Sequence, residues 1–181
     1  MSTNKDNFNL WFREIIESLY ENENAGFSIL MLTFPLLERY LHSKSNTPPK
    51  SSFYGELVKF FTVLPNNKVA KQFWQVYRNG ILHQATLSQR NRDGVRMQDG
   101  WLSGSKKDVE IDSSGVFWVN PIEFAKHVID VINKDFSTHF EAGSFADHPL
   151  AIAQKAPDGS NATSGYGLWI PPFGSHGKTI P

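Results

Sequence analysis

The stretch from Lys68 to Gln89 constrains the fold more than any other part of the chain. Its large apolar residues recur at three- and four-residue spacing, which is the period of one face of an α-helix. These residues are Phe73, Trp74, Val76, Tyr77, Ile81 and Leu82. We therefore expect an amphipathic helix, whose aromatic residues fill the core or a dimer contact. The Asn79-Gly80 pair is a competing signal, because it also favours a turn that would end the helix at Arg78.

This helix carries a cation, an amide and an imidazole on one short segment, namely Arg78, Asn79 and His83. Asn79 lies about one helical turn before His83, so the two share a face on which an amide can orient an imidazole. Arg78 is about 140° from His83 around an ideal helix, but its long side chain can bend to the same place. A permanent cation and a group that titrates near neutral pH suit chemistry on a phosphate. The alternative is a solvated arginine and a structural histidine.

The segment from Tyr77 to Gln84 resembles the Arg-polar-x-x-x-His signature of HEPN (higher eukaryotes and prokaryotes nucleotide-binding) domains. It is most similar to members in which an aromatic residue precedes the arginine and Gly-Ile/Leu-Leu-His follows. HEPN domains are small helical bundles, and many are metal-independent ribonucleases. The resemblance implies that Arg78, Asn79 and His83 are catalytic, with Gly80 and Gln84 in supporting positions.

Glu38 lies near the end of the apolar predicted helix 25–43, which one further helix separates from the motif helix. The second helix of HEPN domains carries an acidic residue late and packs against the motif helix. The resemblance therefore implies that Glu38 orients Arg78 or His83. From the residues alone, the more ordinary interpretation is a surface glutamate beside Arg39 and His42.

The remaining pattern predicts one helical domain over residues 1–140. Apolar periodicity predicts further helices over residues 8–22, 25–43, 53–64 and 121–140. In the first helix, the expected buried stripe is Leu10, Trp11, Ile15, Leu19 and Tyr20. Pro35 should kink the second helix. Asn67 is the expected cap of the motif helix, and Asn120-Pro121 followed by Glu123 predicts the start of the last helix.

Between residues 90 and 120 the period changes from that of helices to that of strands. Short apolar runs alternate with Asp-Gly and Ser-Gly pairs, which favour turns. The clearest pair of runs, 109–112 with 116–119, predicts a β-hairpin just before the last helix. The expected fold class is therefore mainly α, a HEPN-like bundle of four to five helices with a small hairpin.

Residues 141–181 lose periodicity and are rich in glycine and proline, which predicts an irregular C-terminal tail rather than a second domain. Disordered linkers seldom carry many large apolar groups. This segment contains Tyr166, Leu168, Trp169, Ile170 and Phe173. We expect the tail to lie in a groove of its own domain or of a neighbouring subunit.

Composition limits the classes of function. Lysine and arginine total 18 and balance 18 acidic residues, so affinity for RNA must come from a local patch. The candidate patch is Arg90, Arg92 and Arg96 with Lys106 and Lys107, and the alternative is a solvated hairpin surface. The chain has no cysteine and no paired histidine spacing, so we expect neither a metal site nor a cofactor. No apolar run spans a bilayer or forms a signal peptide, so we expect a cytoplasmic protein with no membrane partner.

RNA carries its own nucleophile, the 2′-hydroxyl, so metal-free cleavage needs a base, an acid and a cation. His83 is the candidate acid or base, Arg78 the phosphate clamp, and Asn79 orients the imidazole or binds a phosphate oxygen. One histidine must do two jobs, or two chains supply one each. The HEPN resemblance implies the second solution, a homodimer that leaves 2′,3′-cyclic phosphate and 5′-hydroxyl ends.

Two functions follow. The first is an endoribonuclease of the toxin or defence type, which would have a protein antitoxin or regulator as a partner. The second is a non-catalytic HEPN-like module that binds nucleotides, RNA or a protein, with the motif retained for binding or for structure.

Overall fold

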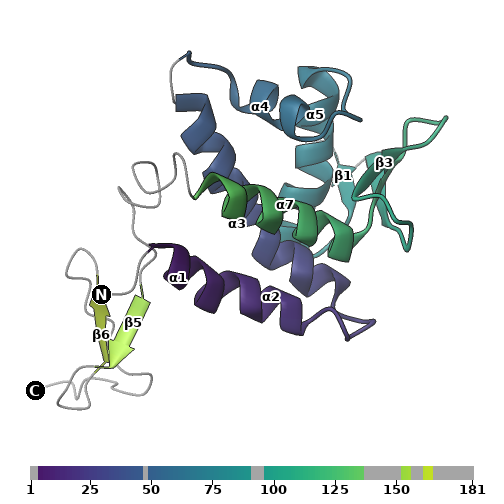
Figure 1. Ribbon diagram of the computed structural model, residues 1–181. Helices are drawn as coiled ribbons and strands as arrows, with labels where there is room; N and C mark the ends of the chain where they lie inside the picture. Colours follow the sequence, from purple (N-terminus) through teal and green to yellow (C-terminus); the bar gives the residue numbers. More distant parts are fainter. Residues whose placement is uncertain (1–3, 47–48, 91–95, 137–151, 156–160, 165–181) are drawn as a thin grey trace, which may run out of the picture.

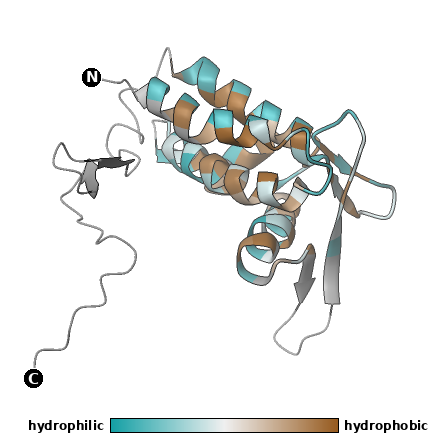
Figure 2. Ribbon diagram, turned by 90° about the horizontal axis from the view of Figure 1, so that it is seen from below, coloured by the Kyte–Doolittle hydropathy of each residue, from teal (hydrophilic) through white to brown (hydrophobic). Residues whose placement is uncertain are grey.

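The computed structural model describes residues 4–46, 49–90, 96–136, 152–155 and 161–164 (Figure 1). Within them the protein is mainly helical, with a small sheet before the last helix, as predicted. The helical elements are α1 (Asn4–Phe8), η1 (Asn9–Arg13), α2 (Glu14–Ser18), α3 (Gly26–Asn46), α4 (Phe53–Phe60), α5 (Asn67–Trp74), η2 (Gln75–Asn79), α6 (Gly80–Gln84) and α7 (Pro121–Asp135). Hydrophobic and hydrophilic residues alternate along these helices (Figure 2).

The N-terminal helix, formed by α1, η1 and α2, buries a different face from the predicted one. Phe8 and Ile16 are fully buried, whereas Leu10 and Ile15 are 54% and 46% exposed. The element η1 is a π-helical turn, which inserts an extra residue and shifts the phase of the helix. Of the other stripe residues, Leu19 and Tyr20 pack against the core, and the side chain of Trp11 lies outside the described part.

The predicted motif helix is present and spans Asn67–Gln84 as α5, η2 and α6. Its cap is Asn66 rather than Asn67, which corrects the prediction by one residue. The side-chain oxygen of Asn66 accepts hydrogen bonds from the backbone N–H groups of Lys68 and Val69, at 3.0 and 3.1 Å. Two N–H groups that a helix start leaves without partners are satisfied in this way.

The Asn79-Gly80 pair does not interrupt the motif helix, and Gly80 is buried within it. The helix ends at Ala85, which adopts the left-handed conformation with φ 48°. The N–H of Thr86 then donates to the carbonyl of Gly80 at 3.2 Å, which closes the last turn. The predicted extension of the helix to Gln89 is wrong, because Gln89 belongs to the first strand.

The sheet is larger than the predicted hairpin. Its strands are β1 (Ser88–Arg90), β2 (Arg96–Leu102), β3 (Val109–Ile111) and β4 (Phe117–Val119), in the order β1-β2-β4-β3. The predicted hairpin is confirmed as β3 and β4, which pair antiparallel. The strand β2 pairs in parallel with β4 and antiparallel with β1. Figure 1 shows the sheet at one end of the helical part.

Tyr77 ties the motif helix to this sheet. A Cβ atom on Gly100 would lie 2.6–2.8 Å from atoms of the Tyr77 side chain, so only glycine allows this approach. The Tyr77 hydroxyl accepts from the N–H of Trp101 at 3.0 Å and shares its proton between the carbonyls of Trp101 and Phe117, both at 2.9 Å. Burial raises the pKa of Tyr77. The interpretation of Tyr77 as a core residue is therefore confirmed.

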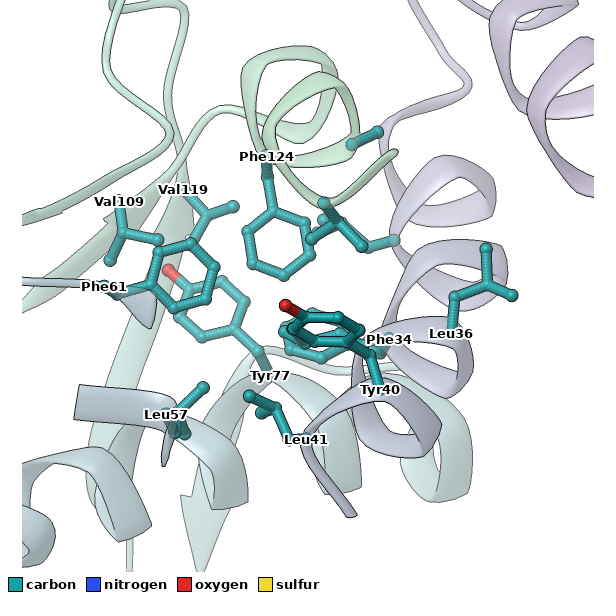
Figure 3. Packing of buried hydrophobic residues seen from close by; sticks show 14 of the residues in the cluster. Phe34, Leu36, Tyr40, Leu41, Leu57, Phe61, Tyr77, Val109, Val119 and Phe124 are labelled. Carbon is teal, nitrogen blue, oxygen red and sulfur yellow. The ribbon is translucent and has the colours of Figure 1, made fainter. Parts of the chain in front are cut away.

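An aromatic cluster joins α3, the motif helix and α7. The ring of Phe34 lies 4.8 Å from that of Phe124 and 5.6 Å from that of Trp74, with the latter pair edge to face. Phe61 stacks on Phe124 at 5.3 Å. Figure 3 shows these phenylalanines and Tyr77 converging from the surrounding helices. This core fixes the position of the motif helix relative to α3.

The start of α7 agrees with the prediction. Asn120 caps it by accepting from the N–H groups of Ile122 and Glu123, at 2.9 and 3.2 Å. The structure follows α7 to Asp135, and the predicted residues from 137 onward lie outside the described part. In the C-terminal segment it describes one antiparallel pair, β5 (Ile152–Lys155) and β6 (Asn161–Ser164), and the apolar residues 166–173 lie outside it. Among the described residues, no helix has both the length and the apolar character needed to cross a membrane.

Candidate active site

The side chain of Arg78 is the centre of a polar cluster that includes all three motif residues. Its Nη1 atom lies 3.1 Å from Oδ1 of Asn79 and 3.1 Å from Nε2 of His83. Its Nε and Nη2 atoms donate to Oε2 of Glu38 at 3.0 and 2.7 Å. The structure thus brings together four of the residues that the sequence singled out.

The side chain of Glu38 contacts Arg78, which is one of the two arrangements that the sequence left open. Glu38 faces Arg78, a residue 40 positions away, rather than forming a surface group with its chain neighbours. Arg39 is half-buried, and this burial lowers its pKa. The ring of His42 lies 4.8 Å from that of Phe53 instead. Only the packing of α3 against the motif helix reveals which neighbour Glu38 selects.

A π-helical turn helps to align Arg78 with His83. Arg78 and Asn79 end this turn, η2, in which the N–H of Gly80 reaches back to the carbonyl of Gln75. Residues five positions apart diverge by about 140° in an α-helix but are hydrogen-bonded neighbours along a π-helical turn. Part of the span from Arg78 to His83 lies in the wider turn. Single π turns of this kind are frequent at functional sites.

The contact between Arg78 and His83 can form a hydrogen bond in one direction only. A guanidinium has no acceptor, so in such a bond Nη1 of Arg78 donates and Nε2 of His83 accepts. His83 is exposed, and the side chains of Arg78 and Glu38 are 23% and 28% exposed. The cluster is thus open to solvent and holds an imidazole nitrogen beside a cation.

The structure describes only some of the other predicted site residues. Gly80 is buried inside the helix, and the side chain of Gln84 lies outside the described part. Arg90 and Arg96 are register partners in β1 and β2, but their side chains lie outside it as well. Arg92 is outside the described residues altogether. The RNA-binding patch therefore stays a prediction.

No pattern in the sequence predicted a second titratable pair. Nδ1 of His127 lies 2.5 Å from Oδ2 of Asp108, and the imidazole stacks on the ring of Phe60 at 4.7 Å. Burial on its own would raise the pKa of Asp108, but the hydrogen bonds from His127 and from the backbone N–H of Val109, with the electrostatic interaction with His127, together outweigh it, and the pKa is lowered. The two residues are 19 positions apart and come from different elements, so no spacing rule links them. They line a separate cleft, of about 760 Å³, whose lining includes neither Arg78 nor the three residues that contact it.

In the part of the chain that the structure describes, no three histidine, aspartate or glutamate residues are arranged to hold a metal ion. Comparisons with family models, with curated proteins and with solved structures found no match to this chain. A function must therefore be argued from the cluster itself.

Proposed function

We propose that this protein is a metal-independent endoribonuclease of the HEPN-like type, acting as a homodimer in a toxin or defence role. The supporting observation is that one nitrogen of Arg78 lies 3.1 Å from both Asn79 and His83 on a solvent-accessible surface. A cation and an imidazole at this distance match the needs of RNA cleavage through the 2′-hydroxyl.

In the proposed reaction, the neutral His83 takes the proton of the 2′-hydroxyl, whose oxygen then forms a bond to phosphorus. The bond from phosphorus to the 5′-oxygen breaks, and a protonated imidazole supplies the proton of the leaving hydroxyl. The products are a 2′,3′-cyclic phosphate and a 5′-hydroxyl. Arg78 stabilises the charge that develops on the phosphate oxygens, which replace Asn79 and His83 as acceptors of its Nη1 hydrogens.

Glu38 has a positioning role in this proposal. Its Oε2 atom accepts from Nε and Nη2 of Arg78, which leaves Nη1 directed at Asn79 and His83. A guanidinium held along one edge presents its other edge to a phosphate in a fixed orientation. The cost is electrostatic, since the carboxylate neutralises much of the field that would attract RNA.

A second copy of the chain would supply the second imidazole. The face of α3 that bears Glu38 also bears Phe27 and Met31, which are 36% and 45% exposed, and the exposed Pro35. Their spacing of four, eight and eleven residues from Phe27 puts them on one stripe of the helix. An exposed apolar stripe that leads to the cluster is suited to bury against a second copy and to bring two clusters together.

The alternative is a non-catalytic HEPN-like module that binds a nucleotide, RNA or a protein. Because Glu38 pairs with Arg78 at 2.7 Å, the cluster attracts phosphate less strongly than a free arginine would. This observation favours the protein-binding form of the module.

The test is incubation of the purified full-length protein with end-labelled RNAs in excess EDTA. We expect fragments with cyclic-phosphate and 5′-hydroxyl ends. A matched RNA with 2′-deoxy nucleotides at the cleaved positions should resist cleavage there, because the nucleophile is absent. Bound but intact RNA, across substrates of different sequence, would contradict the ribonuclease proposal and support the binding module.

A further inference from the structure

Two tryptophans lie next to each other on the outer face of the small sheet. Successive residues of a strand point to opposite faces. Gly100 meets Tyr77 of the motif helix, so the next residue of β2, Trp101, points away from the helices. Trp118 is the register partner of Trp101 in β4, where it stands between two buried residues. The two indoles therefore share the face of the sheet that is turned away from the core.

This tryptophan pair is both held in place and exposed. The ring centroids of Trp101 and Trp118 are 6.0 Å apart, with 25° between the ring planes, so the indoles stack. The indole N–H of Trp118 donates to Oδ2 of Asp112 at 3.1 Å, which fixes the orientation of this ring. Trp101 is 50% exposed, although tryptophan is highly buried on average. Rigid, exposed tryptophans are typical of binding surfaces, because they supply contact area at a low cost in conformational entropy.

A negative charge lies beside the pair. The backbone N–H groups of Ser114 and Val116 donate to Oδ1 of Asp112 at 2.8 and 3.0 Å, so the carboxylate is fixed next to the Trp118 indole. The hydrogen bond from the indole, followed by those from the backbone, lowers the pKa of Asp112, which is therefore ionised at neutral pH. Among the described residues, no cation forms an ion pair with this carboxylate.

The neighbouring charges of β3 do not neutralise Asp112. Glu110, the register partner of Trp118, pairs with Lys107 at 3.1 Å, so these two charges compensate each other. Lys106 has no ion pair among the described residues, but it precedes β3, whereas Asp112 follows β3 at the opposite end of the strand. The Trp118 indole is bonded at the Asp112 end. The uncompensated charge next to the indoles is therefore negative.

The aromatic rings and the carboxylate favour the same kind of ligand, a cation. An indole face attracts a cation more strongly than the ring of tyrosine or phenylalanine does. Lysine ammonium groups lie over the rings of Tyr40 and Tyr20, but no described one lies over a tryptophan of this pair. A nucleobase could also stack on an indole, but its phosphates would meet the negative charge of Asp112. A guanidinium suits both features, because it stacks on aromatic rings and donates hydrogen bonds to carboxylates.

We propose that Trp101, Trp118 and Asp112 form a binding surface for an arginine side chain of a partner protein. The guanidinium stacks on the indole pair beside the carboxylate of Asp112. The residues that contact Arg78 are not part of this surface, so the proposal holds whether or not the protein cleaves RNA.

The test uses the full-length protein and a display library of short random peptides. The library is first depleted on a Trp101→Ala variant, and the peptides that the parent protein then retains are sequenced. We expect the retained peptides to share an arginine. The most enriched one is synthesised as the probe, beside a version with citrulline in place of that arginine. Citrulline is planar but uncharged, so affinity should fall roughly tenfold, the combined effect of an exposed cation–π contact and an exposed ion pair.

Variants of the protein locate the bound probe. Trp101→Leu keeps an apolar side chain but removes the ring, and should weaken binding about two- to fivefold. Asp112→Asn keeps an acceptor for the Trp118 indole but removes the charge, and should weaken binding up to about fivefold. The matched control Glu14→Gln removes an exposed carboxylate of α2 and should leave affinity unchanged. Urea unfolding of all three variants checks that the fold is kept.

Several results would overturn the proposal. Depletion that leaves no peptide for the parent protein would show that the indoles bind no protein segment. Retained peptides without a shared arginine, or equal affinity for the arginine and citrulline probes, would exclude a cationic ligand. Equal affinity of the probe for both variants and the control would exclude this location. Filter binding of single-stranded RNA should be the same for the parent and for Trp101→Leu, and a loss in the variant would assign the indoles to nucleobases instead.

Discussion

At the scale of single residues, Arg78 joins the carboxylate of Glu38 to the amide and imidazole of the motif. Lysine could replace the charge but not the contacts, because a guanidinium donates along two edges at once. Each edge of the guanidinium has a different partner. Glu38 accepts from one edge, and the other edge faces Asn79 and His83. Binding and catalysis by this cluster should therefore respond differently to changes at Glu38.

Glu38→Gln should change RNA binding and RNA cleavage in opposite directions. The amide keeps an acceptor for Arg78 but removes the neutralising charge, so RNA should bind up to about fivefold more tightly at low salt. The looser guanidinium should lower the rate of cleavage per bound RNA, by roughly tenfold. Filter binding and single-turnover cleavage measure these two quantities. A loss of both in parallel would mean that Glu38 acts only through folding.

The pair of Asp108 and His127 makes a prediction about stability and pH. Burial raises the pKa of Asp108, but hydrogen bonds from His127 and the backbone, with the electrostatic interaction with His127, together hold its folded-state pKa below the ordinary value of 3.8. A lowered pKa stabilises the fold above the unfolded-state value, and this contribution disappears as the pH falls through the folded-state value.

Asp108→Asn should therefore destabilise the protein at neutral pH, by about 1.5–3 kcal/mol, the range for a hydrogen bond to a charged group. The deficit relative to the parent protein should shrink below about pH 4. Urea unfolding at neutral and acid pH gives both values. A deficit that is independent of pH would show that charge on Asp108 does not contribute.

At the scale of elements, the sheet supports the motif helix through the contact of Gly100 with Tyr77. Gly100→Ala would place a methyl group within 2.6 Å of the Tyr77 ring. We expect a loss of about 1–3 kcal/mol in the free energy of unfolding, since a packed core accommodates an added group poorly. Gly104→Ala is the matched control, because a Cβ there meets nothing within 4 Å. Thermal unfolding measures the stability of both variants. Equal stability of the two would contradict the proposed role of the contact between Gly100 and Tyr77.

Some of the helices and strands could be predicted from the sequence, and others could not. Local signals located the motif helix and the start of α7, because periodicity and a capping residue such as Asn120 act over a few residues. The π turns were missed because one inserted residue shifts a helix face without changing its composition, which misplaced Leu10 and Ile15. The parallel pairing of β2 with β4 joins segments that carry no shared local signal.

In the candidate site, too, local spacing was predictable from the sequence and contacts between distant segments were not. The shared face of Asn79 and His83 follows from their spacing along one helix, whereas the contact of Arg78 with His83 also depends on the π turn η2. The choice of Glu38 depends on how α3 packs, which periodicity alone does not determine. The pair of Asp108 and His127 spans 19 positions and two elements, so it became visible only in the folded chain.

At the scale of the whole molecule, the proposed dimer is testable through the exposed stripe of α3. Met31→Asp puts a charge on a 45% exposed side chain, so the monomer fold should be kept while the dimer dissociates. Cleavage should fall with it, because each chain then has one imidazole. Ser28→Asp, also exposed on α3 but about 100° from Phe27, is the matched control. Light scattering during gel filtration measures the mass, and a parent protein that is monomeric while active would contradict the dimer.

RNA cleavage in excess EDTA by His83→Ala beside His42→Ala decides whether the cluster is catalytic. Both changes remove an exposed histidine, but only His83 contacts Arg78. We predict that the His83 variant loses at least about 100-fold in rate, the lower range for a general acid or base. The His42 variant should cleave like the parent. Equal cleavage by the two variants would contradict a catalytic role for the cluster.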